Sequence, residues 1–104
     1  MNVFLPSPII RDRQGRLAKT LVLHEWLAKL DEELDEVKLA AMSDNVDFDY
    51  HDDTSFGNVA EELQDLITVA TSMLYNYVGL DEQKRNELCA YVNEKNRKRG
   101  YFED

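Results

Sequence analysis

Cysteine and long apolar runs are both scarce in this sequence. Cys89 is the only cysteine, which excludes a disulfide within the chain and favours a reducing, cytoplasmic setting. No apolar run approaches the roughly 18 residues that a membrane span needs. The start MNVFLPSPII lacks a basic leader and is interrupted by Pro6 and Pro8, so we expect no signal peptide. We therefore expect one cytoplasmic domain, residues 1–104, with no membrane partner.

Positive charge is scarce in the middle of the chain. Between residues 25 and 65 only Lys29 and Lys38 are basic, and the other basic residues lie towards the two ends. The formal net charge is −9. Nucleic acid polymers bind clustered Lys and Arg that neutralise phosphates, so this distribution argues against such a partner. An acidic middle could instead hold cations, and basic ends could hold anions.

Helical spacing of apolar residues predicts a long helix from about residue 16 to residue 42. Its apolar stripe is formed by Leu23, Leu27, Leu30, Leu34, Val37 and Ala41. Before this helix, residues 1–15 contain two prolines and the turn-like DRQGR, so we expect an irregular arm that could pack on a neighbouring chain. After it, the Asp-rich residues 43–54 are expected to form a loop that could shape or cover a pocket.

Two further helices are predicted from their capping signals and apolar faces. One begins at Thr54 or Ser55 and ends at about residue 78, where Gly79 suits a C-terminal cap. The next begins at Asp81, whose carboxylate can cap it, and ends near Gly100. We find no convincing strand. The predicted class is all-α, with three main helices that complete a bundle by pairing between chains, as a homodimer or a dimer of dimers.

Acidic residues on two predicted helices lie beside the apolar stripes. At about 100° per residue, Glu33 and Glu36 in KLDEELDEVKLA border the stripe of the first helix, and Glu32 lies farther round. Glu62 and Asp65 in AEELQDLI border the apolar face of the second helix in the same way. If the two helices pack antiparallel, four carboxylates converge.

Converging carboxylates are costly without a cation, because partly buried acids without a counter-charge either destabilise the fold or take up protons. Oxygen ligands in this number suit Mg²⁺ or Mn²⁺. The alternative, that these residues form solvated faces of acidic helices, stays open.

A basic group closes the third predicted helix in NEKNRKRGYF. Lys95 and Arg99 lie one turn apart and Asn96 is adjacent to Lys95, so these donors suit phosphate oxygens. The alternative is equally strong, because the helix macrodipole favours cations near any helix C-terminus.

Taken in order, these three motifs resemble those of the MazG-like all-α nucleoside triphosphate pyrophosphohydrolases. The match consists of EELDE at Glu32–Glu36, ELQD at Glu62–Asp65 and KNRKRGYF at Lys95–Phe102, and it covers about residues 20–102. The resemblance implies Mg²⁺-dependent hydrolysis of a (deoxy)nucleoside triphosphate to the monophosphate and pyrophosphate, as in clearance of unwanted nucleotides.

The resemblance also implies roles for individual residues. The metal ligands would be Glu33, Glu36, Glu62 and Asp65. Glu32 would assist as an outer ligand or by orienting water. Contacts to the triphosphate or sugar would come from Lys95, Asn96 and Arg99.

Trp26 has two interpretations. It lies seven positions before Glu33 on the same helix face, so it could border the pocket and stack on a base. Packing in the core is the favoured alternative. A zinc-protease helix is excluded, because HEWLA has Ala28 where a second His is needed. A calcium loop starting at Asp47 is also excluded, because Asp52 stands where Gly is required.

Two other functions stay open at this point. Within the same fold, the chain could be a phosphoribosyl-ATP pyrophosphohydrolase, although the C-terminal motif fits the nucleoside triphosphate enzymes better. From a different class, it could be a non-catalytic helical module whose acidic face binds a basic protein.

Overall fold

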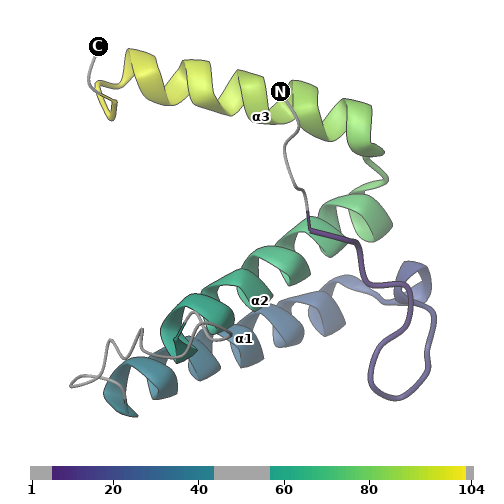
Figure 1. The fold of residues 1–104 in the computed structure, drawn as a ribbon. Coiled ribbons are helices and arrows are strands. Elements are labelled where there is room, and N and C mark those ends of the chain that lie inside the picture. Colours follow the sequence, from purple (N-terminus) through teal and green to yellow (C-terminus); the bar gives the residue numbers. More distant parts are fainter. Residues whose placement is uncertain (1–5, 44–56, 103–104) are drawn as a thin grey trace.

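The computed structural model describes residues 6–43 and 57–102, and over these ranges the chain is helical with no strand (Figure 1). The elements in chain order are the short 3₁₀ helix η1 (Ala18–Thr20), α1 (Leu23–Ser43), α2 (Asn58–Met73), the π-helical turn η2 (Leu74–Val78) and α3 (Glu82–Lys98). The predicted all-α class with three main helices is confirmed for the described ranges. Within them, no helix combines the length and apolar character that a membrane span requires.

α1 and α2 form an antiparallel hairpin and lie side by side along their length (Figure 1). The core sits at the end of this hairpin where α1 begins. Its buried side chains are Ala18, Leu21, Trp26 and Val69, and the partly buried Ile9, Leu30 and Met73 pack against them. Trp26 and Leu30 lie one turn apart on α1, so they present one face to α2. This packing sets the register between the two helices.

The second helix ends, and the third helix begins, where the sequence predicts. η2 continues α2 and ends at Gly79, whose φ of 86° is the left-handed conformation that glycine adopts without strain. The Gly79 N–H bonds to the Leu74 carbonyl oxygen. The Asp81 carboxylate then accepts a hydrogen bond from the Lys84 N–H at 2.9 Å, which caps α3.

α3 leaves the hairpin and makes no extensive contact with α1 or α2 (Figure 1). None of its side chains is fully buried. Apolar residues on and after it are accordingly open to solvent, with Tyr91 66% and Tyr101 68% exposed. In the single chain, α3 is therefore held to the core mainly through its connection to η2.

The first helix begins later than predicted. We expected it from about residue 16, whereas α1 starts at Leu23. The Ala18 N–H donates to the Ile10 carbonyl oxygen at 2.8 Å, and Arg11 forms an isolated β-bridge with Leu17. These partners occupy backbone groups that a longer helix would use, so tertiary hydrogen bonding overrides the local periodicity.

The described part of the N-terminal arm packs on its own chain. The Ile9 N–H donates to the Ser72 hydroxyl at 2.8 Å, and the Asn76 side-chain amide donates to the Ile9 carbonyl oxygen at 3.0 Å. Ser72 is fully buried, so the arm both uses and satisfies a polar group of the core. The sequence allows the arm to pack on a neighbouring chain, whereas Ile9 is bonded to Ser72 of α2 and Asn76 of η2 in the same chain.

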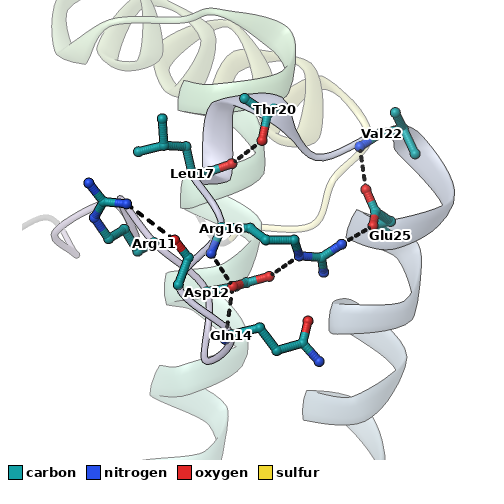
Figure 2. A network of polar contacts seen from close by, with 9 residues as sticks. Arg11, Asp12, Gln14, Arg16, Leu17, Thr20, Val22 and Glu25 are labelled. Atoms are coloured by element: carbon teal, nitrogen blue, oxygen red, sulfur yellow. Dashed lines mark hydrogen bonds and ion pairs between the residues drawn. The ribbon is translucent and has the colours of Figure 1, made fainter.

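A polar network fixes the turn that precedes α1 (Figure 2). The Asp12 carboxylate accepts hydrogen bonds from the N–H groups of Gln14 at 2.9 Å and Arg16 at 2.8 Å, and from the Arg16 side chain at 2.8 Å. Arg16 also donates to Glu25, whose other oxygen accepts from the Val22 N–H at 3.0 Å and caps α1. Burial acts to raise the pKa of Asp12, but the hydrogen bonds outweigh it and hold this pKa below 3.8.

Other predicted features fall outside the described residues. These are the Asp-rich loop beyond Ser43, the capping candidates Thr54 and Ser55, and the first five residues of the arm.

Truncation of Trp26 tests the placement of the core. We expect Trp26→Ala to lower the free energy of unfolding by about 3–5 kcal/mol, because a fully buried aromatic ring would be lost. Trp26→Phe is the control. The Trp26 Nε1–H has no hydrogen-bond partner among the described residues, so phenylalanine sacrifices no hydrogen bond and should cost much less. Urea denaturation followed by circular dichroism measures both, and a wild-type midpoint for Trp26→Ala would contradict the placement.

Candidate metal centre

Glu33 on α1 meets Glu62 and Asp65 on α2 because the two helices run antiparallel in contact (Figure 1). One carboxylate oxygen from each of the three residues lies within 4.8 Å of the other two. Glu62 and Asp65 are three positions apart, which places them on one side of α2. The hairpin thus brings together three of the four predicted metal ligands.

Glu36, the fourth predicted ligand, lies beside Glu62. Both residues line a cavity of about 270 Å³ at the far side of the group. Burial raises the pKa of Glu62, and the negative charge of Glu36 raises it further. Glu36 therefore borders the group of three without joining its closest spacing. We refer to Glu33, Glu36, Glu62 and Asp65 as the acidic cluster.

Two oxygens of the acidic cluster are buried without a partner. The Oε2 atoms of Glu33 and Glu62 are shielded from solvent and receive no hydrogen bond from the described residues. A buried carboxylate oxygen that is left unpaired is strongly unfavourable, and such groups in folded proteins usually bind a donor or an ion. Both oxygens belong to residues that face each other across the hairpin, so one cation between the helices could satisfy them together.

The electrostatics of the acidic cluster favour protonation or cation binding. Burial raises the pKa of Glu33 above its ordinary 4.5, and the negative charges of Glu36 and Asp65 raise it further. Arg13 opposes this rise with its positive charge. Burial also raises the pKa of Glu62, and the neighbouring carboxylates add to the effect. A bound cation would lower both pKa values by neutralising the repulsion.

The donor set fits a hard divalent cation. All of the converging ligand atoms are carboxylate oxygens, which Mg²⁺ and Mn²⁺ prefer, and no His or Cys belongs to the group among the described residues. Glu33, Glu62 and Asp65 would hold the ion. Glu36, which lies beside Glu62, could provide a further oxygen ligand. Glu32 is exposed and does not belong to the group of three, but it lines a neighbouring cavity together with Glu33.

The predicted substrate-binding residues do not join the acidic cluster in the single chain. Lys95, Asn96 and Arg99 lie in the last turn of α3 and just after it, and α3 makes no extensive contact with α1 or α2. The Asn96 carbonyl oxygen accepts from the N–H groups of Arg99 and Tyr101, which closes the helix. Trp26 is also absent from the site, because it is fully buried in the core and presents no face to a base.

Arg13 and Lys29 were missed as neighbours of the acidic cluster. Lys29 could have been found from spacing, since it precedes Glu33 by four residues and so lies on the same face of α1. Arg13 could not, because the turn that carries it is placed by hydrogen bonds between distant parts of the chain.

The raised pKa of Glu33 predicts a pH-dependent cost to stability. An acid whose pKa is raised by folding stabilises the folded state below its unfolded pKa and loses this contribution as pH rises through the folded pKa. We expect Glu33→Gln to melt a few degrees above the wild type at pH 7 without metal, with the difference shrinking as pH falls towards 4.5. Saturating Mg²⁺ should reverse the order, because the wild type alone keeps all its ligands.

The matched control for this prediction is Asp31→Asn, which removes one charge from an exposed position of α1. Thermal melting at pH 4.5 and pH 7, with and without Mg²⁺, separates the two variants. If Glu33→Gln and Asp31→Asn behaved alike, Glu33 would not be in a cluster of repelling carboxylates.

Comparison of this chain with family models, with curated proteins and with solved structures gives no match. Its function is therefore inferred from the residues of the site and from their geometry.

Proposed function

We propose that this chain is a Mg²⁺-dependent nucleoside triphosphate pyrophosphohydrolase with a MazG-like helical bundle. The observation that carries the proposal is a pair of buried carboxylate oxygens, on Glu33 and Glu62 beside Asp65, that have no hydrogen-bond partner among the described residues. The motif resemblance supports the same reading, because its metal-binding positions are the ones that converge. The substrate would be a (deoxy)nucleoside triphosphate, and the products the monophosphate and pyrophosphate.

The carboxylates of the site would have two roles, to hold the metal ion and to orient water. Glu33, Glu62 and Asp65 would hold the ion, and Glu36 would complete the oxygen ligands from the Glu62 side. When bound, Mg²⁺ supplies positive charge to phosphate oxygens and acidifies coordinated water. Glu32, which lies beside Glu33 at the adjoining cavity, would orient the attacking water. Addition of that water at phosphorus and cleavage of the bond between the α- and β-phosphates give the two products.

The proposal includes a homo-oligomer in the cytoplasm. Apolar side chains of the hairpin remain partly open in the single chain: Leu27, Leu34, Leu63 and Ile67 are each 41–47% exposed. Two hairpins that bury these residues against each other would form a four-helix bundle, which is a common way to complete an all-α fold. A dimer, or a dimer of dimers, would also allow α3 of one copy to approach the acidic cluster of another.

Metal binding provides the first test, because it separates the enzyme from a non-catalytic acidic module. An ion that binds only the folded state raises the melting temperature by mass action. We expect millimolar Mg²⁺ or Mn²⁺ to raise the melting temperature of the wild type by several degrees, and Glu62→Gln to abolish this rise. The melting temperatures are measured by differential scanning calorimetry in Ca²⁺-free buffer.

Glu61→Gln is the matched control for the metal test. It removes the neighbouring exposed carboxylate of α2, so its response to metal should equal that of the wild type. An unchanged wild-type melting temperature would favour the alternative in which the acidic surface binds a basic protein.

Pyrophosphate release provides the second test. Purified protein incubated with Mg²⁺ and a panel of ribo- and deoxyribonucleoside triphosphates should release pyrophosphate from at least one of them. We expect Asp65→Asn and Glu62→Gln each to lower the rate by about 10²-fold or more, because the loss of a group that only orients a metal ligand already costs about 10- to 100-fold. Glu61→Gln should retain the wild-type rate. No release from any nucleotide, or full activity in Asp65→Asn, would refute the proposed activity.

A further inference from the structure

A cavity that combines both signs of charge adjoins the acidic cluster. It measures about 200 Å³ and lies between the N-terminal turn and α1. Its acidic residues are Glu32, Glu33 and Asp12, of which Asp12 is already bound by Gln14 and Arg16, and its basic residues are Arg11, Arg13 and Lys29. Because Glu33 belongs both to this cavity and to the candidate metal site, a ligand in the cavity would lie next to a bound ion.

Two of the basic residues in this cavity are not committed to a partner. Arg13 and Lys29 form no ion pair or hydrogen bond with the described part of the chain, whereas Arg16 is held by Asp12 and Glu25. Arg13 is nevertheless close enough to Glu33 for its charge to act on that carboxylate. These groups can therefore donate to a ligand without first breaking an internal bond.

The turn that presents Arg13 is held by hydrogen bonds on both sides of that residue. The buried Asp12 carboxylate, 2% exposed, binds the backbone on the far side of Arg13 at Gln14 and Arg16 (Figure 2). On the near side, Ile9 is tied to α2 and η2 through Ser72 and Asn76. Anchors on both sides fix the backbone at Arg13 relative to α1, so its position beside Glu33 is a property of the fold.

We infer that Arg13 and Lys29, with Arg11 at the edge of the cavity, bind the polyphosphate part of the substrate. This inference rests on the proposed function and names a part of the same site. Guanidinium groups bind phosphate oxygens in a bidentate way, and an ammonium group adds a second positive charge. The carboxylates alone would repel a polyphosphate, so binding requires the divalent cation.

Within one chain, the basic residues closest to the acidic cluster differ from those in the sequence motif. The sequence motif pointed to Lys95, Asn96 and Arg99, which lie on α3 away from the hairpin. The N-terminal turn instead supplies positive charge from the same chain, because Arg11 and Arg13 line the same cavity as the candidate metal ligand Glu33.

Inorganic tripolyphosphate is the probe for this subsite, because it has the charge of the nucleotide tail but no base or sugar. Isothermal titration of tripolyphosphate into the protein, with Mg²⁺ in excess over the phosphate chain, measures its affinity. We expect Arg13→Gln and Lys29→Gln each to weaken binding about tenfold or more, as the loss of a charge-assisted hydrogen bond does. Arg13→Lys should recover part of the loss, and chelation of Mg²⁺ should abolish binding.

Lys19→Gln is the matched control. Lys19 is an exposed residue of η1 that lies outside the cavity, so its loss reports the effect of net charge alone. Mn²⁺ binding, followed by electron paramagnetic resonance without phosphate, is measured in parallel. It should remain within about threefold of the wild type in Arg13→Gln, because Arg13 is not a metal ligand.

The outcomes separate this inference from the proposed function. If Mn²⁺ binds and only Arg13→Gln and Lys29→Gln lose tripolyphosphate, the subsite is supported. If Mn²⁺ binds but these variants match Lys19→Gln, the subsite is refuted and the proposed function stands. If the wild type fails to bind Mn²⁺, the proposed function fails and the inference fails with it.

Discussion

Repulsion between carboxylates that face each other across the α1–α2 hairpin is the constraint on which the site depends. The core pairs Trp26 with Val69, and this packing sets the register of the two antiparallel helices. The same register brings Glu33 to within 4.8 Å of Glu62 and Asp65, measured between carboxylate oxygens. Burial of apolar side chains thus holds together charges that would otherwise separate. The result is a fold in which Glu33 and Glu62 hold protons more tightly than they do in the unfolded chain.

The N-terminal arm has a structural and an electrostatic role at once. Ile9 packs against the core and satisfies the buried Ser72 hydroxyl, so the arm closes the open end of the hairpin. The Asp12 turn that follows returns the chain to α1 and leaves Arg13 beside Glu33. An arm that only covered apolar surface would need no such defined turn. Here the closure of the core and the placement of a positive charge come from one segment.

Helix class, helix ends and the candidate ligands were largely predictable because their signals are local. Gly79 ends its helix through its own left-handed backbone, and Asp81 caps α3 by reaching an N–H three residues away. The start of α1 was predicted too early, because the Ala18 N–H bonds to Ile10, and helical periodicity carries no information on such a pairing. Trp26 was ambiguous for a similar reason: its helix face was clear, but whether anything covered that face was not.

The sequence by itself determined that residues 6–43 and 57–102 contain three main helices, where most of these helices end, and which carboxylates border the apolar stripes. Those properties follow from the fixed geometry of residues three and four positions apart. Only the tertiary structure decided that Glu33, Glu62 and Asp65 form the closest group of carboxylates and that Glu36 borders it. It also decided that the N-terminal turn, and not the last turn of α3, stands beside them in the single chain. These choices depend on helix register and on hydrogen bonds between residues more than sixty positions apart, such as Ile9 and Ser72, which no local pattern specifies.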